Sequence, residues 1–307
     1  MKLRALPCGI AAVLLAVAQA GCGGSSQGPA EKVDERYDTA SRAGRFALEN
    51  EQLTDAAQQY RTALRRAQQT DDIEAIGDAS YNLAVVELRQ GNARDAAAVA
   101  ATGRRELERR GRQPFAALLL AEAAALYRSG DRAGADALLN RIVQAREPDA
   151  ATLARAHYIR GLILADRGDA VGVRNEAAAI PAGGDVAARA DRRELEARAA
   201  MIQSDAGTAR TAADEAAALR REAADYKGMA SALALAGEAA ERQQDNSAAA
   251  DRYLRAGRSA LLQSDYGNAE TWLRRARADA AKAGSTGMTA AIDGLLRESA
   301  TRRATRT

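Results

Sequence analysis

Few side chains of this sequence could carry out covalent or metal chemistry. His157 is the only histidine, and Cys22 is the only cysteine beyond the N-terminal segment 1–21. The chain therefore offers no cysteine nucleophile, no histidine base and no usual zinc or haem site, and we predict no catalytic residue, no metal, no cofactor and no enzyme activity. Acidic pairs such as Glu194 and Glu196 are better explained by helix dipoles and exposed faces than by acid–base catalysis. We expect His157 to be a packed or surface residue, with a pH switch as the alternative.

The N-terminal segment 1–21 has the three parts of a secretory signal peptide. Lys2 and Arg4 give it a basic start, an apolar stretch follows at 10–18, and small residues lead to its end. The apolar stretch is too short to cross a bilayer stably as a helix of the mature protein. We expect this segment to be removed during export.

Small residues surround Cys22 in the stretch 20–23, Ala-Gly-Cys-Gly. This stretch resembles the bacterial lipobox. The resemblance implies cleavage before Cys22, lipid attachment to its thiol and, with no aspartate after it, an outer-membrane anchor that faces the periplasm. Segment 22–33, which contains a Gly/Ser-rich stretch, would then be a flexible tether. Gln19 departs from the apolar residue of the lipobox, and 18–20 also suits ordinary signal peptidase, which would release a soluble periplasmic protein.

Composition favours an all-α protein. Of the 307 residues, 47% are apolar but only 4% are aromatic, and much of the apolar share is alanine. Alanine lets helices pack closely on one another, whereas a sheet needs more β-branched and aromatic side chains. The length suits a solenoid, because each repeat of a solenoid packs only on its neighbours.

Charge is balanced along the chain. The formal net charge is +3 and the isoelectric point is about 9.0, so the sequence does not indicate nucleic acid as a partner. Two basic clusters, at 104–112 and from Arg297 onward, are expected to be solvated helix ends and tail, where cations suit the helix dipole. Contact with an anionic lipid or polymer is the alternative.

Helix–turn–helix patterns recur from residue 34 to 303. The clearest copies are 82–96 and 160–169, each with a helix followed by a Gly-Asn or Gly-Asp turn. These copies resemble the tetratricopeptide repeat (TPR). The resemblance implies a right-handed α-solenoid of about six to seven helical hairpins over 34–303, with a capping helix near 288–302 and a basic tail at 304–307.

Three kinds of position recur in these copies, each with a packing reason. A small residue lies where two helices cross closely, an alanine opens the second helix, and a larger side chain fills the gap to the next repeat. The small residues are Gly44, Ala84, Ala123, Gly161, Ala197, Gly237 and Gly257; the alanines are Ala56, Ala96, Ala135, Ala209, Ala249 and Ala269; the larger side chains are Tyr60, Leu139 and Tyr253.

A turn separates the two helices of each hairpin. At three of the turns a glycine permits the positive φ that ends a helix without steric cost. The turns are about 36 to 40 residues apart, except for the last two, which are about 20 apart. We interpret the short spacing as a half-repeat, in which one helix at 247–263 serves two hairpins. The turn residues are Glu51, Gly91, Gly130, Gly168, Ser204, Gln244 and Ser264.

First helices line the concave face of a TPR solenoid, so the repeat register predicts a groove. An apolar and aromatic floor bordered by arginines suits an extended peptide or a helix that carries carboxylates; a plain helical surface with packed tyrosines is the alternative. The groove residues are Arg45, Tyr81, Val85, Arg89, Leu120, Ala124, Arg128, Arg155, Tyr158 and Leu162. The equivalent positions of the last repeats, expected to be a solvated face of mixed charge, are Glu194, Arg198, Glu238, Glu241 and Arg258.

Two functions fit these features. The first is an envelope scaffold, held at the membrane through Cys22, that binds a protein or peptide; the resemblance is to TPR lipoproteins of outer-membrane, pilus or secretion, and cell-wall complexes. The second is a small-ligand or transporter accessory, which needs a closed cavity lined by Tyr81, Tyr127 and Tyr158. No motif in the sequence selects the partner.

Overall fold

The computed structural model describes residues 34–146 and 149–304 of the chain. The predicted signal peptide, Cys22, the tether 22–33 and residues 305–307 of the basic tail lie outside the described residues. The chain divides into a unit Met1–Asp34 and a compact unit Glu35–Thr307, and all helices of the described residues lie in the second unit.

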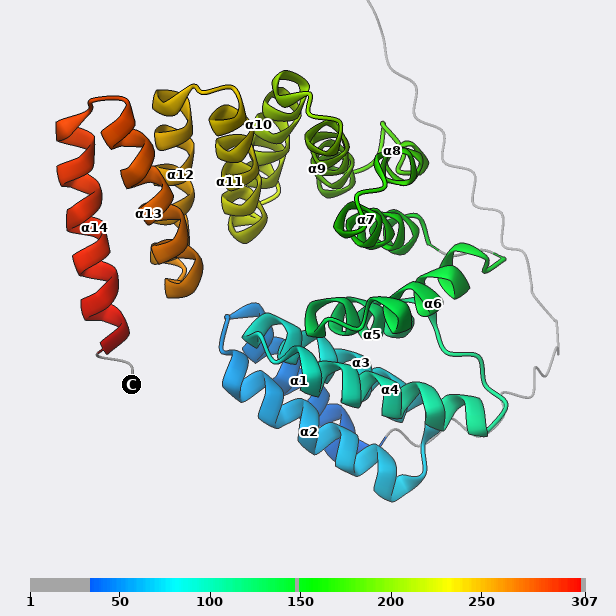
Figure 1. The fold of residues 1–307 in the computed structure, drawn as a ribbon. Coiled ribbons are helices and arrows are strands. Elements are labelled where there is room, and N and C mark those ends of the chain that lie inside the picture. Colours follow the sequence, from blue (N-terminus) through cyan, green and yellow to red (C-terminus); the bar gives the residue numbers. More distant parts are fainter. Residues whose placement is uncertain (1–33, 147–148, 305–307) are drawn as a thin grey trace, which may run out of the picture. The chain divides into compact units, whose positions relative to one another are not determined.

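The described residues form fourteen helices and no strand, which confirms the predicted all-α solenoid. Each helix packs on the next in chain order, so that seven hairpins stack side by side (Figure 1). The helices are α1 (Glu35–Glu49), α2 (Leu53–Thr70), α3 (Ile73–Gln90), α4 (Ala93–Arg109), α5 (Ala116–Ser129), α6 (Arg132–Val143), α7 (Ala150–Asp166), α8 (Ala170–Ala179), α9 (Val186–Ile202), α10 (Ala206–Glu222), α11 (Tyr226–Arg242), α12 (Asn246–Leu262), α13 (Tyr266–Lys282) and α14 (Thr286–Ala304).

Aspartate residues define most of the helix starts. At α3 and at α6 to α13, an aspartate just before the helix accepts hydrogen bonds from backbone N–H groups of the first turn. Asp149, for example, accepts from the Thr152 N–H at 2.8 Å. Each such cap contributes about 1 kcal/mol, because it satisfies a donor that has no partner within the helix.

All seven predicted turn residues have positive φ, from 59° at Glu51 to 95° at Gly130. The helix predicted at 247–263 is α12. The half-repeat interpretation is wrong, however, because Ala224 and Gly284 also have positive φ, after α10 and α13. From α9 onward, the turns within hairpins and between hairpins are alike and follow one another about every 20 residues. The seventh hairpin is therefore complete, with α14 as its second helix.

The recurring packing positions are confirmed. All alanines predicted at helix crossings and at the start of second helices are fully buried. A Cβ atom added to Gly44 would lie 2.9 Å from the ring of Tyr60, closer than real Cβ contacts allow. Small residues therefore let the helices approach until larger side chains fill the remaining space.

The fourth hairpin departs from the regular pattern. Its second helix, α8, has only ten residues. As α3 contacts α5 and α5 contacts α7, so α7 contacts α9 directly. At this contact, Gly161 of α7 lies under Leu195 of α9, where an added Cβ would be 2.5 Å from the leucine side chain. The inner side of α9 is consequently covered by α7.

Candidate partner-binding face

The predicted groove residues lie on the first helices of the first four hairpins. Arg45 belongs to α1, residues 81–89 to α3, residues 120–128 to α5 and residues 155–162 to α7. Because α3 contacts α5 and α5 contacts α7, the residues on these three helices belong to adjoining surfaces. We call the groove residues of α3, α5 and α7 the inner face.

Aromatic and aliphatic members of the inner face take part in packing. Tyr81 meets the ring of Phe115 edge-on, with ring centroids 5.9 Å apart and ring planes at 75°. Leu120 and Leu162 are half-buried against the core that extends from α5 to α9, and Val85 is also half-buried. Only part of each side chain therefore remains for a partner.

Arg155 and Tyr158 belong to a group of mostly charged side chains around Tyr158. Four of its members are buried, and the side chains of Arg155 and Arg198 are 42% and 35% exposed. We call this group the Tyr158 cluster; its members are Arg155 and Tyr158 of α7, Asp191, Glu194 and Arg198 of α9, and Arg220 of α10. Arg220 donates to Asp191 Oδ1 at 2.6 Å and to Glu194 Oε2 at 3.0 Å. Arg155 donates to both oxygens of Asp191, at 2.7 and 2.9 Å. Arg198 donates to Glu194 Oε1 at 2.9 Å.

The Tyr158 ring lies beside two guanidinium groups. The Cζ atom of Arg155 is 4.8 Å from the ring centroid, and that of Arg220 is 5.4 Å from it. At these distances the cations are attracted by the face of the ring. Burial raises the pKa of Tyr158 well above its usual value, so its hydroxyl stays neutral and acts as a packing and hydrogen-bonding group.

The two carboxylates of the cluster respond differently to burial. Burial raises the pKa of Asp191, although Arg155 and Arg220 oppose the shift. Burial acts in the same direction on Glu194, but Arg198 and Arg220 outweigh it and lower the pKa. Both side chains are only 3% exposed. Each buried carboxylate can remain charged because it has two guanidinium partners.

The expectation of a solvated face is wrong at Glu194, which is 3% exposed, whereas the Arg198 side chain is 35% exposed. The direct packing of α9 on α7 turns Glu194 inward. Asp191 and Arg220 are members of the cluster that sequence reasoning missed. A signal was present, because Asp191 and Glu194 lie three residues apart and therefore share one side of a helix rich in alanine.

Arg128 is a cation of the inner face that forms no ion pair with a described carboxylate. Its Nη1 donates to the backbone carbonyl of Leu88 at 3.1 Å. Partial burial and the neighbouring Arg155 guanidinium lower the pKa of Arg128. The nearby carboxylate of Asp225 already accepts from Arg220 at 3.0 Å. The guanidinium groups in this region therefore outnumber the carboxylates, and the charge of Arg128 is left uncompensated.

A pocket of about 470 Å³ lies beside Arg128, and we call it the inner pocket. Residues at the ends of α3 and α5, at the start of α11 and around the turn between α12 and α13 line it. Arg89 and Lys227 add two exposed cations. Trp272, the only tryptophan of the chain, adds an aromatic side chain. The pocket thus brings Arg89 and Arg128 of the predicted groove together with residues that the groove prediction did not include.

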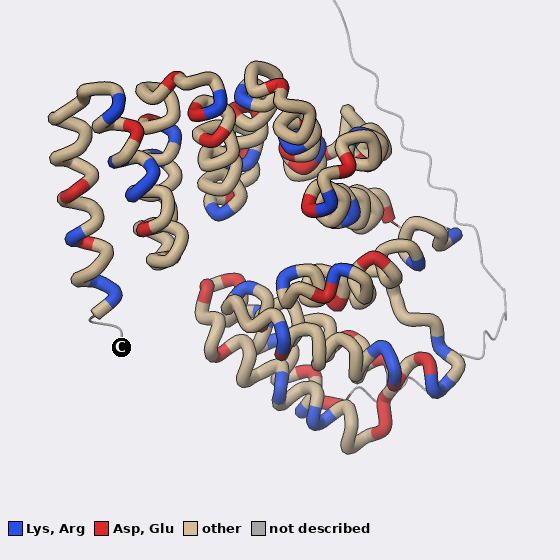
Figure 2. The backbone as a smooth tube through the Cα atoms, in the orientation of Figure 1, with Lys and Arg blue, Asp and Glu red and all other residues tan. Residues whose placement is uncertain are grey.

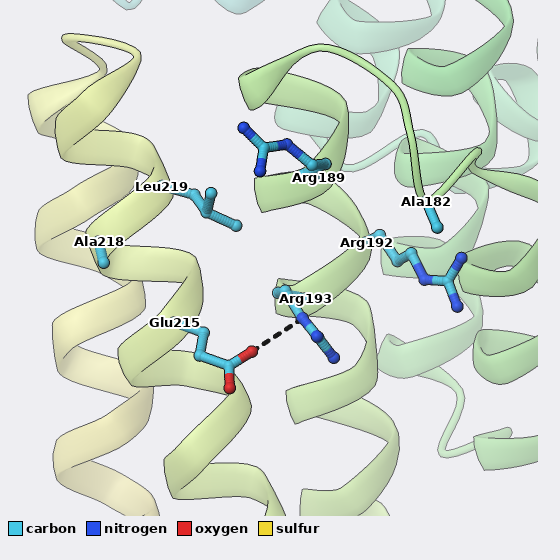
Figure 3. A pocket seen from close by; sticks show the side chains of 7 residues that line it. All are labelled: Ala182, Arg189, Arg192, Arg193, Glu215, Ala218 and Leu219. Atoms are coloured by element: carbon cyan, nitrogen blue, oxygen red, sulfur yellow. Dashed lines mark ion pairs between the residues drawn. The ribbon is translucent and has the colours of Figure 1, made fainter.

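A second pocket of about 510 Å³ contains more arginines, but carboxylates neutralise them. It lies between α9 and α10, and Figure 3 shows Arg193 paired there with Glu215, with Nε and Oε2 2.9 Å apart. Arg189 and Arg192 also have carboxylate partners, at 3.7 and 2.9 Å. An anionic partner would have to displace these internal pairs, which makes this pocket the weaker candidate.

The basic cluster at 104–112 is largely ion-paired as well. Arg104 pairs with Glu122 and Arg112 pairs with Glu74, each with 2.7 Å between nitrogen and oxygen. Figure 2 shows basic and acidic residues interspersed over the helices. This distribution favours solvated helix ends over a surface for an anionic lipid or polymer.

His157 is a packed residue. Its Nδ1 lies 2.8 Å from Glu176 Oε2, and Glu176 also pairs with Arg160 at 3.3 Å, so the histidine helps to hold α8 against α7. Within the described ranges, no group of three His, Cys, Asp or Glu side chains could hold a metal ion. Nor does any helix there have the length and apolar character needed to cross a membrane.

Comparisons with known proteins give structural likeness without a family. No protein-family model matches the sequence, and no curated protein matches it. Among solved structures, the chain is similar to a tetratricopeptide repeat protein from Parabacteroides merdae, with 16% identity over 86% of this chain and 98% of that chain and a TM-score of 0.49. It is also similar to BtubC from P. vanneervenii, with 14% identity over 89% of this chain and 93% of that chain and a TM-score of 0.45.

At these identities the likeness concerns the fold alone. The small residues at the helix crossings, the buried alanines and the positive φ of the turns carry the assignment of the repeat. The second unit is a solenoid of TPR-like hairpins.

Proposed function

We propose that this protein is a scaffold of the bacterial cell envelope that binds a segment of a partner protein along its inner face. The observation that carries the proposal is the inner pocket, to which residues of α3, α5, α11, α12 and α13 contribute. A surface assembled from several repeats suits an extended segment, because such a segment can contact several hairpins at once.

The proposal places the scaffold at the membrane through Cys22. The signal peptide and the lipobox-like stretch around Cys22 support acylation of this residue. A coil of the length of segment 22–33 has an average reach of about 20 Å, which keeps the solenoid near the bilayer and leaves it free to turn. The alternative is a soluble periplasmic protein cleaved after Ala20.

A small-ligand function has less support. It requires Tyr81, Tyr127 and Tyr158 to line one cavity, but Tyr81 packs against the core around α3 to α5, whereas the other two belong to the core that extends to α9. Tyr158 is also buried among the charged groups of its cluster. These rings fill space in two different cores.

Site-specific photo-crosslinking in the native host tests the scaffold proposal. A photoreactive phenylalanine analogue is placed at Arg89 on the inner face and, as a matched control, at Arg94, an exposed arginine of α4. We expect a discrete crosslinked product with an envelope protein at Arg89 alone. Equal products at both positions would contradict the proposal, as would the absence of any product at Arg89, Val85 and Ala124.

A further inference from the structure

The inner pocket combines three cations with little opposing charge. Arg89, Arg128 and Lys227 are among its lining residues, and Asp265 is the only acidic residue among them. The Asp265 carboxylate accepts from the Asn268 backbone N–H at 3.2 Å and from its side-chain amide at 2.7 Å. Asp265 thereby caps the start of α13, so its carboxylate hydrogen-bonds to that helix instead of pairing with the three cations.

Arg128 has a defined position beside the pocket. Its bond to the Leu88 carbonyl fixes the guanidinium at the end of α3. The neighbouring Arg155 is satisfied by Asp191, so Asp191 is not free to neutralise Arg128. An anion in the inner pocket would relieve the repulsion between the two guanidinium groups.

The pocket also has an apolar part. Trp272 lines it together with Leu88, Ala230 and Ala260. The cations come from α3, α5 and α11, so a segment with several carboxylates can offer a partner to each of them. An apolar or aromatic side chain of the same segment can pack against the tryptophan.

We infer that the inner pocket anchors a carboxylate-rich segment of the partner protein, with an apolar or aromatic residue beside its carboxylates. The inference rests on the proposed function and adds the chemistry of the partner. Arginine and lysine donate charge-assisted hydrogen bonds to carboxylates, and these are stronger than bonds between neutral groups.

Peptide selection with the full chain tests this inference. A displayed library of random peptides is selected on the wild-type protein, and the enriched peptides are titrated while the fluorescence of Trp272 is followed. Since Trp272 is the only tryptophan, its emission reports on the inner pocket directly. We expect enrichment of Asp and Glu next to an apolar or aromatic residue, and an affinity that falls as salt screens the charges.

Variants of the pocket give the decisive comparison. Arg128→Ala and Lys227→Ala should each weaken an enriched peptide about 10-fold, and the double variant about 100-fold, because each removes a charge-assisted contact. Arg94→Ala, which removes an exposed arginine of α4, should leave the affinity unchanged. Circular dichroism checks that the variants are folded, as expected for changes at exposed side chains.

Several results would overturn the inference. The inference fails if no peptide is enriched, if the enriched peptides lack acidic residues, or if the double variant binds them with unchanged affinity. Inorganic phosphate that changes Trp272 emission at concentrations matching the peptide affinity would identify a small-anion site instead. If Val85→Ser weakens the enriched peptides and the double variant does not, the scaffold proposal stands and the inference fails; if crosslinking at the inner face also fails, both are wrong.

Discussion

Replacing Arg220 by methionine removes the central cation of the Tyr158 cluster. Arg220 is 3% exposed and lies 2.6 Å from Asp191 and 3.0 Å from Glu194. Methionine fills similar space without charge, so both buried carboxylates keep one guanidinium partner instead of two. Removal of one partner from a buried ion pair costs about 3–5 kcal/mol. Because Arg155 and Arg198 remain, we expect the lower end of this range, about 3 kcal/mol.

Urea unfolding, followed by circular dichroism at 222 nm, measures this loss. With a dependence on urea of about 2–3 kcal/mol per M, the midpoint should fall by roughly 1 M. A solenoid can open hairpin by hairpin. Limited proteolysis at the connector 180–185 therefore gives a second measure of the destabilisation. This connector leads into α9, which carries three members of the cluster, so we expect faster cleavage there in the variant.

The loss of unfolding free energy in Arg220→Met should depend on pH. Burial already raises the pKa of Asp191, and Arg220→Met removes one of the two cations that oppose this shift. A carboxyl group whose pKa is higher in the folded state than in the unfolded state destabilises the protein at neutral pH, and the destabilisation disappears as the pH falls through the folded pKa. The deficit of Arg220→Met should accordingly shrink as the pH is lowered from 7 into the acid range.

Arg221→Met is the matched control. Arg221 is the next residue of α10, and its side chain is exposed, so this change should alter the free energy of unfolding by less than about 0.5 kcal/mol. Equal urea midpoints for the two variants, or a deficit that does not shrink in acid, would refute the account of a buried, charged cluster.

Three further changes test the packing, the caps and the anchor. Gly161→Val should destabilise the solenoid by about 1–3 kcal/mol in urea unfolding, because the added Cβ lies 2.5 Å from a leucine of α9; Gly183→Val, with no atom within 4 Å of its Cβ, should have little effect, and similar losses would contradict the packing argument. Asp245→Ala should cost about 1 kcal/mol by removing the cap of α12, measured as a lower melting temperature, whereas Asp251→Ala, at an exposed position inside α12, should cost less. Cys22→Ser should abolish incorporation of labelled palmitate and release the protein from membranes; persistence of the label would rule out this anchor.

The repeat could be predicted because its signals are local. Glycine or a polar residue at a turn, the aspartate after it and a buried alanine four residues after the aspartate all act within a few residues of one another. Ala224 was missed because its side chain gives no sign of a positive φ. The aspartate that follows Ala224 was the available signal, since an aspartate also follows the turns at Ser204, Gln244 and Ser264.

The residues that line the inner pocket could be predicted only in part. The repeat register placed Arg89, Arg128 and Tyr158 on the correct helices, since register is a property of each repeat. It did not show that Tyr158 is buried, because that depends on how closely α9 approaches α7 after the short α8. The contacts that decide this, such as Gly161 under Leu195, join residues of different hairpins.

Helix class, repeat register and helix ends follow from the order of residues alone, because caps, turns and apolar periodicity each involve neighbours along the chain. The Tyr158 cluster and the inner pocket arise from packing between hairpins. Arg220 meets an aspartate 29 residues earlier in the chain, and Lys227 shares a pocket with Arg89. Whether such residues meet depends on the distance and rotation between successive hairpins, added up over every hairpin that separates them. No local pattern of residues specifies this accumulated geometry.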